Sequence, residues 1–104
     1  MIEHLFSSLN FSAEESRTYL ALLESGPVPA GILAKKMGVP RPSIYGFLKR
    51  LVEKGAVTQT DKKGVTLFIA ERPEAIIGLF RNKMEQLESS RNKFEKLIPA
   101  LEKK

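Results

Sequence analysis

The chain has 104 residues, 42% of them hydrophobic and 28% charged, which suffices for one compact domain and one long appended helix. It contains no cysteine, which excludes a disulfide framework, a thiol nucleophile and a thiolate metal site. No apolar run approaches the ~20 residues that span a bilayer. The N-terminal sequence MIEHL lacks the basic flank and apolar core of a signal peptide. We therefore expect a cytoplasmic protein without a membrane partner.

The composition also argues against catalysis. The only histidine, His4, lies near the N-terminus, where we interpret it as a solvated residue of a short helix. The sequence patterns HExxH, GxSxG and GxGxxG and the phosphate-binding P-loop do not occur. We expect no enzyme, no catalytic residue, no cofactor and no metal site.

The formal net charge of +5 is unevenly distributed along the chain. Residues 1–28 contain one Arg and four Glu, a net charge of −3. Residues 29–69 contain eight Lys or Arg and two acids, a net charge of +6, whereas residues 70–104 contain eight and six, a net charge of +2. A surface that serves solubility alone would intersperse the two signs. The middle segment is therefore a candidate for contact with a polyanion.

The first third of the chain predicts three helices. A short helix covers residues 2–9, before an asparagine. Ser12 and Glu15 have the spacing of a capping box, in which each side chain bonds the backbone N–H of the other. They start a second helix over residues 12–24, which a Ser-Gly-Pro sequence ends. A third helix of barely two turns covers residues 29–38 and ends in glycine.

The middle segment predicts a longer helix and then a hairpin. Because proline restricts the residue before it, we expect Arg41 at the cap and Pro42 at the first position of a helix over residues 42–54. Residues 56–60 and 65–70 are rich in β-branched side chains and flank the turn sequence DKKG, which indicates a hairpin. The apolar residues of the helix have the spacing of one buried stripe: Ile44, Phe47, Leu48, Leu51 and Val52.

Two helices joined by a glycine-containing turn, the second with a basic face, make up a helix-turn-helix, and the hairpin makes it winged. We predict a mainly α fold with a small β-hairpin. Residues 1–72 would form a winged helix-turn-helix DNA-binding domain and residues 73–104 a C-terminal coiled-coil dimerisation helix. A helix fits the major groove of DNA, where residues near its N-terminus reach base edges. The predicted DNA-binding residues are Arg41, Pro42, Ser43, Tyr45, Gly46, Lys49, Arg50, Lys62 and Lys63.

These residues are assigned different contacts. Arg41, Ser43 and Tyr45 are candidates for base or sugar edges, and the four later cations are candidates for phosphate. Gly46 costs about 1 kcal/mol of helix stability relative to alanine, and its bare position indicates close approach of a ligand. The alternatives are that the cations form an ordinary solvated surface and that Tyr45 packs on the flank of the domain.

A last long helix starts at Pro73, and its apolar residues recur in alternating steps of three and four. Seven of the eight positions of this seam are apolar, and Arg91 is the exception, placed to pair with Glu88 or Glu95. Lys83 and Glu88 would attract across a parallel pair, which alone does not decide the orientation. A seam of nearly four heptads favours a coiled-coil homodimer. Its predicted dimerisation residues are Ile77, Phe80, Met84, Leu87, Arg91, Phe94, Ile98 and Leu101.

The alternative for this helix is that its stripe packs back on its own domain. Ile76 and Leu79 widen the stripe near its start, so both contacts can occur there. Pro99 lacks the N–H of the helical hydrogen-bond ladder, so we expect the final residues to kink or fray.

From Leu5 to about Glu74 the chain resembles the TrmB-type winged-helix transcriptional regulators. The stretches that carry the resemblance are LNFSAEE (9–15), YLALLESG (19–26), AKKMGVPRPSIY (34–45) and LKRLVEKG (48–55). The resemblance implies that the helix over residues 42–54 is the recognition helix. Gly46 stands where such proteins usually carry a larger polar residue. The chain ends at Lys104 without the effector-binding domain of the larger members, so sugar sensing is not carried over.

The sequence thus favours a homodimeric regulator, a repressor, that binds double-stranded DNA sequence-specifically. The alternative is a winged-helix adaptor, in which the recognition helix and the tail dock a partner protein.

Overall fold

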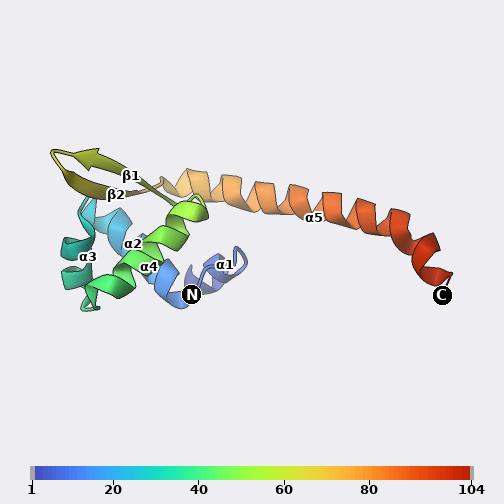
Figure 1. Cartoon of the computed structure of the whole chain (residues 1–104), viewed down its shortest axis with the longest axis horizontal. Helices are drawn as coiled ribbons and strands as arrows, with labels where there is room; N and C mark the ends of the chain where they lie inside the picture. Colours follow the sequence, from blue (N-terminus) through green and yellow to red (C-terminus); the bar gives the residue numbers. More distant parts are fainter. Residues whose placement is uncertain (1, 104) are drawn as a thin grey trace.

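The computed structural model describes residues 2–103; Met1 and Lys104, the outer limits of the two predicted domains, lie outside the described residues. A globular unit occupies one end of a molecule of 60 × 25 × 24 Å, and one long helix projects from it (Figure 1). The predicted mainly α fold with a hairpin and a long C-terminal helix is confirmed. The elements are α1 (Ile2–Ser7), α2 (Ala13–Ser25), α3 (Ala30–Met37), α4 (Arg41–Glu53), β1 (Val57–Lys62), β2 (Val65–Ala70) and α5 (Pro73–Glu102).

The junction of α1 and α2 follows the sequence signals closely. α1 ends at Ser7, two residues earlier than predicted, and Asn10 then adopts a left-handed conformation with a φ of 64°, which asparagine tolerates. The capping box is present: the Ser12 hydroxyl accepts a hydrogen bond of 3.0 Å from the Glu15 N–H. The Glu15 carboxylate in turn accepts one of 3.1 Å from the Ser12 N–H.

The turn between α3 and α4 differs from the prediction by one residue. Gly38 ends α3 in the left-handed conformation, as expected. The backbone N–H of Ile44 donates to the Pro40 carbonyl over 3.2 Å, so Pro40 is the cap of α4 and Arg41 its first helical residue. Pro42 therefore stands at the second position. Its missing N–H is harmless there, because the first four N–H groups of a helix have no partner within the helix.

The hairpin has a tighter turn than predicted. Asp61 and Lys62 belong to β1, and only Lys63 and Gly64 connect the strands, both with positive φ. Positive φ at both central residues defines the two-residue turn whose twist matches that of the flanking strands. A second backbone pairing was not predicted: Val28, between α2 and α3, bridges Phe68 of β2 through reciprocal backbone hydrogen bonds.

The core lies where α2, α3 and α4 meet the hairpin and the start of α5. Ile76 of α5 is buried, and Leu79 and Phe80 pack against the core. The Leu79 side chain lies so near Gly55 that a β-carbon there would stand 3.3 Å from it. The first two turns of α5 therefore fix its direction relative to α4. The largest fully buried apolar side chains are Tyr19, Leu22, Leu33, Ile44, Leu48, Leu51 and Val57.

Beyond these turns α5 leaves the domain as one helix (Figure 1). Pro99 lies inside the helix, which continues to Glu102, so the proline does not end it. Figure 1 shows the final turns bending away from the axis of the earlier part, in line with the expected kink. Within residues 2–103, no helix has the length and apolar character needed to cross a membrane.

Candidate nucleic-acid interface

Helix α4 presents two contrasting faces. Of the five residues of the predicted stripe, Ile44, Leu48 and Leu51 are fully buried, whereas Phe47 and Val52 are half-buried and pack against the core. Among the predicted contact residues on the other faces, Ser43 and Gly46 are half-buried and the remaining five are exposed. Those five are Arg41, Pro42, Tyr45, Lys49 and Arg50.

The first turn of α4 joins two of the predicted base-contact residues. The Arg41 guanidinium donates a long hydrogen bond of 3.4 Å to the Tyr45 hydroxyl, and its central carbon lies 5.8 Å from the centre of the ring. The guanidinium also rests on α3, where a β-carbon at Gly31 would stand 3.3 Å from it. Ser43 faces a hollow of about 470 Å³ between α2 and α4 instead. Arg41 and Tyr45 thus form one exposed unit, with Ser43 beside it.

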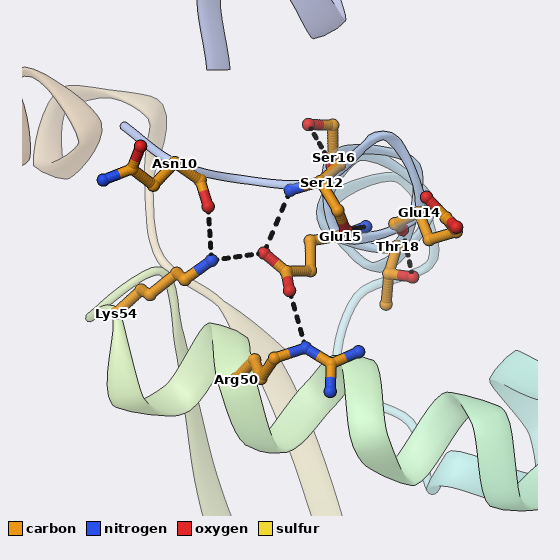
Figure 2. Close-up of polar contacts among 8 residues, drawn as sticks. All are labelled: Asn10, Ser12, Glu14, Glu15, Ser16, Thr18, Arg50 and Lys54. Carbon is orange, nitrogen blue, oxygen red and sulfur yellow. Dashed lines mark hydrogen bonds and ion pairs between the residues drawn. The ribbon is translucent and has the colours of Figure 1, made fainter. Parts of the chain in front are cut away.

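The Arg50 side chain does not extend freely into solvent, as the predicted phosphate contact would suggest, but is bound to a buried carboxylate (Figure 2). Its Nε donates a hydrogen bond of 2.7 Å to Glu15, whose side chain is only 3% exposed. Lys54 donates to the other carboxylate oxygen of Glu15 over 2.5 Å and to the Asn10 carbonyl over 2.6 Å. With the Ser12 N–H, three donors meet on one carboxylate, two from the C-terminal end of α4 and one from the start of α2. This cluster, Glu15 with Ser12, Arg50 and Lys54, joins α4 to the start of α2.

The cluster keeps its buried carboxylate ionised. Burial, the largest single influence, raises the pKa of Glu15, but the hydrogen bonds from Lys54, Arg50 and Ser12 together outweigh it. The net pKa of Glu15 is lowered from its usual 4.5. A carboxylate that accepts charge-assisted hydrogen bonds favours its charged form in this way.

From the sequence we predicted only the capping box of Ser12 and Glu15 in this cluster, and not the ion pairs of Glu15 with α4. The signal for the rest was present: Glu15 shares the buried face of α2 with Tyr19 and Leu22, at helical spacings of four and three. A charged residue on a buried stripe needs a partner of opposite sign. The partners could not be identified from the sequence, because Arg50 is 35 residues away.

The half-exposed Arg50 still has a side that faces solvent. Its side chain is 48% exposed, and its two terminal nitrogens lie over Gly46, 3.7 and 3.9 Å from where a β-carbon would be. The guanidinium also lies 5.6 Å from the ring centre of Phe47. Because Gly46 has no side chain, the outer face of α4 is flat at this position, and the Arg50 guanidinium lies over it. Whether Arg50 contacts phosphate stays a prediction.

The predicted wing lysines lie at the tip of the hairpin. Lys62 and Lys63 are both exposed. In Figure 1 this tip projects at the end of the molecule that carries α3, opposite the C-terminus of α5. Lys35 and Lys36, in the last turn of α3, are exposed as well and were not among the predicted contacts. The cations of the middle segment therefore lie on several elements of one end of the molecule.

The seam of α5 is exposed along most of its length. Phe80 packs on the core, while Ile77 is 58% and Met84 69% exposed. Arg91 pairs with Glu95 one turn later over 3.3 Å, one of the two pairings expected for it. The other exposed seam residues are Leu87, Phe94, Ile98 and Leu101.

Known proteins share both the sequence and the shape of this chain. The model of the family "Sugar-specific transcriptional regulator TrmB" matches residues 5–74. The uncharacterised protein YrhO of Bacillus subtilis is 47% identical over 53 residues, which cover 51% of this chain and 19% of that protein. This chain spans about a fifth of the length of that relative.

Solved structures extend the similarity to the whole fold. One is TrmBL2, described as an archaeal chromatin protein, with a TM-score of 0.84 at 24% identity, over 97% of this chain and 38% of that one. Another is MepR of Staphylococcus aureus in complex with DNA, with a TM-score of 0.59 at 17% identity, over 96% of this chain and 88% of that one. At these identities the structures establish the winged-helix fold. Because the family model covers most of the chain, the protein belongs to the TrmB family of transcriptional regulators.

Proposed function

We propose that this chain is a homodimeric regulator of transcription that binds double-stranded DNA sequence-specifically and represses by obstructing the polymerase. The observation that carries the proposal is the exposed pair of Arg41 and Tyr45 on the first turn of α4, with basic residues around it. An arginine can donate two hydrogen bonds to guanine in the major groove, where a recognition helix places its N-terminal residues.

The other contacts in the proposal fix the position of the helix. Lys49 on α4 and Lys62 and Lys63 on the hairpin would bind phosphates, which set register and orientation without reading sequence. Arg50 would direct its terminal nitrogens to phosphate while its Nε stays on Glu15. MepR, whose structure is described as a DNA complex, and TrmBL2, described with a mode of DNA binding, support a nucleic-acid partner for this fold.

The dimer in the proposal is based on α5. Its exposed seam residues would be costly to leave in water, and a heptad seam of this length is typical of a two-stranded coiled coil. The two winged-helix domains of such a dimer, each with its recognition helix α4 as reading head, are tethered to each other. Once one is bound to a duplex, the second binds at a high effective concentration, which raises the affinity.

Selection of bound sites from random duplex DNA, followed by binding measurements across a range of salt, tests the function. Binding to the selected site should weaken steeply with salt, because each neutralised phosphate adds about −0.9 to the slope of log K against log salt. The Arg41→Ala variant should lose about 1–3 kcal/mol of discrimination at one base pair per half-site. A flat salt response, or unchanged discrimination by Arg41→Ala, would contradict the proposal and favour a protein partner.

The hairpin provides a matched pair of variants for the same assay. Replacing Lys62 and Lys63 by alanine should weaken binding to all sequences alike and reduce the slope by about 1.8 per protomer. Replacing Lys93 and Lys96, which are also exposed but belong to α5, makes the same change in charge. That control variant should bind as the unaltered protein does. Equal losses in both would show that only net charge matters.

A further inference from the structure

An apolar hollow lies at the base of α5. Hydrophobic side chains of α1, α2 and the first turns of α5 enclose about 210 Å³ between them. Four of these residues are exposed at its rim: Ile2 is 45%, Leu5 60%, Leu23 39% and Ile77 58% exposed. Such a concentration of exposed large hydrophobic residues around a depression is typical of a contact surface.

The hollow is continuous with the exposed seam of α5. Ile77 and Phe80 line the hollow and are also the first two seam residues. From there the apolar face runs uninterrupted to Leu87, and after Arg91 it resumes at Phe94. A partner for the seam must therefore fit a surface that is a groove at the domain end and a helix face beyond it.

Arg91 distinguishes between the two orientations of a second helix. In heptad notation the seam has a positions at residues 77, 84, 91 and 98 and d positions at residues 80, 87, 94 and 101. In a parallel pair each a residue faces the same a residue, so the two Arg91 side chains would meet in one layer. The flanking residue of the partner helix there is Ser90, which is uncharged, so each Arg91 would keep only its pairing with Glu95 of its own helix. A charge enclosed beside a like charge is strongly unfavourable.

An antiparallel pair removes this conflict. There each a position faces a d position of the second copy. A single register pairs all eight seam positions: residue 77 faces 101, 80 faces 98, 84 faces 94, and 87 faces 91. Arg91 then faces an apolar residue, Leu87, and lies beside Glu88 of the second copy. The e positions face each other across the same side, which brings Arg81 opposite Glu95 of the second copy twice, by symmetry. The two Glu88 residues also meet near the axis, where both Arg91 side chains are close to them.

We infer that α5 packs antiparallel against α5 of a second copy, with the two-fold axis crossing the seam at the level of residue 89 and with Ile98 and Leu101 of each copy covering the hollow of the other. The inference deepens the proposed homodimer and rests on it. The same register that pairs the charges places the apolar C-terminal turns over Ile77 and Phe80. The hollow of one copy and the C-terminal end of the other copy's helix would thus bury each other's apolar surface. Pro99 occupies a b position, on the outer face, where its missing N–H does not interrupt the seam.

Because the chain contains no cysteine, single cysteines can report the orientation. Ile77→Cys and Leu101→Cys variants, one of them carrying a tag that changes its mass, are mixed, allowed to exchange subunits and oxidised. An antiparallel pair brings residue 77 of one copy near residue 101 of the other, within the Cβ separation of about 3.5–4.5 Å that a disulfide requires. The expected product is the mixed disulfide, without like-with-like dimers. Lys93→Cys, on the outer face, is the matched control and should remain uncrosslinked.

A charge exchange gives an independent readout without cysteines. Arg81→Glu and Glu95→Arg variants each place like charges opposite one another in the antiparallel homodimer and should dimerise more weakly. Mixed together, they restore both pairs, so the mixed dimer should form in preference to either homodimer. In a parallel pair these e positions do not meet, and no such preference would arise.

The outcomes separate this inference from the function on which it rests. Like-with-like disulfides, or the absence of mixed disulfides and of mixed-dimer preference in a protein that is dimeric, would overturn the antiparallel arrangement and leave the homodimer intact. A monomer in sedimentation at micromolar concentration would overturn both. Mixed disulfides together with the preferred mixed dimer would establish the arrangement.

Discussion

Replacement of Glu15 by glutamine is the most direct test of the cluster that joins α4 to α2. Glutamine keeps the shape and one acceptor oxygen but removes the charge that Arg50 and Lys54 share. A hydrogen bond to a charged group is worth about 1.5–3 kcal/mol, and removing one partner of a fully buried pair costs about 3–5 kcal/mol. The Arg50 and Lys54 side chains are 48% and 30% exposed, so water can rehydrate them and reduce this loss. We expect Glu15→Gln to lower the free energy of unfolding by about 2 kcal/mol.

For a domain of this size, such a loss corresponds to a fall in Tm of about 10 °C. Thermal unfolding followed by circular dichroism, at one protein concentration for all variants, measures it. Glu14→Gln is the matched control: it neutralises the neighbouring, exposed glutamate of the same helical turn. The control should shift Tm by only a few degrees, because a charge near a helix N-terminus is worth about 0.3–1 kcal/mol.

The pH dependence gives the result that would refute the reasoning. The pKa of Glu15 in the folded protein is lowered from 4.5, so the cluster contributes its stability above that value and loses it as pH falls through the lowered pKa. The difference between the unaltered protein and Glu15→Gln should therefore be full at neutral pH and shrink in acid. A difference of less than two degrees at pH 7, or one that persists undiminished in strong acid, would show that the ion pairs are not what stabilises this junction.

Two further predictions concern the contacts that hold α5 to the domain. The Tyr19 hydroxyl donates a hydrogen bond of 2.7 Å to the Glu71 carbonyl, so Tyr19→Phe should lower the free energy of unfolding in urea by about 1–2 kcal/mol; no change would mean that water satisfies that carbonyl equally well. Gly55 has a φ of 84° and Leu79 against it, whereas Gly78 is helical with nothing within 4 Å. Gly55→Ala should therefore destabilise by more than 1 kcal/mol and Gly78→Ala stabilise by about 0.5–1 kcal/mol in the same unfolding assay, and an equal effect of the two would contradict the packing described.

Local signals in the sequence sufficed for most of the fold. Ser12 with Glu15, Gly38, and Pro73 at the start of the last helix each specify a helix end through interactions that lie within a few residues. The errors at element ends have the same local scale: the cap of α4 moved by one residue because the Pro40 carbonyl accepts the first helical hydrogen bond. The prediction failed where partners are distant, as for the bridge between Val28 and Phe68, which no periodicity encodes.

The site shows the same division. The exposed and buried faces of α4 followed from the spacing of its apolar residues. The pairing of Arg41 with Tyr45, one turn apart, could have been proposed from their spacing. The engagement of Arg50 by Glu15 required the tertiary structure, because it depends on how α2 crosses α4. A cation on an exposed face can therefore have a structural partner that the helix pattern alone does not reveal.

Because α5 runs uninterrupted from the core to Glu102, its length would set the distance between the two recognition helices of the dimer. Deleting one heptad from the projecting part would bring the two reading heads of an antiparallel dimer closer by about 10.5 Å, close to three base pairs at 3.4 Å each. The same deletion would rotate the seam by only about 20°. Insertions and deletions of whole heptads could thus match such regulators to operators of different length, while the helix that reads the bases stays unchanged.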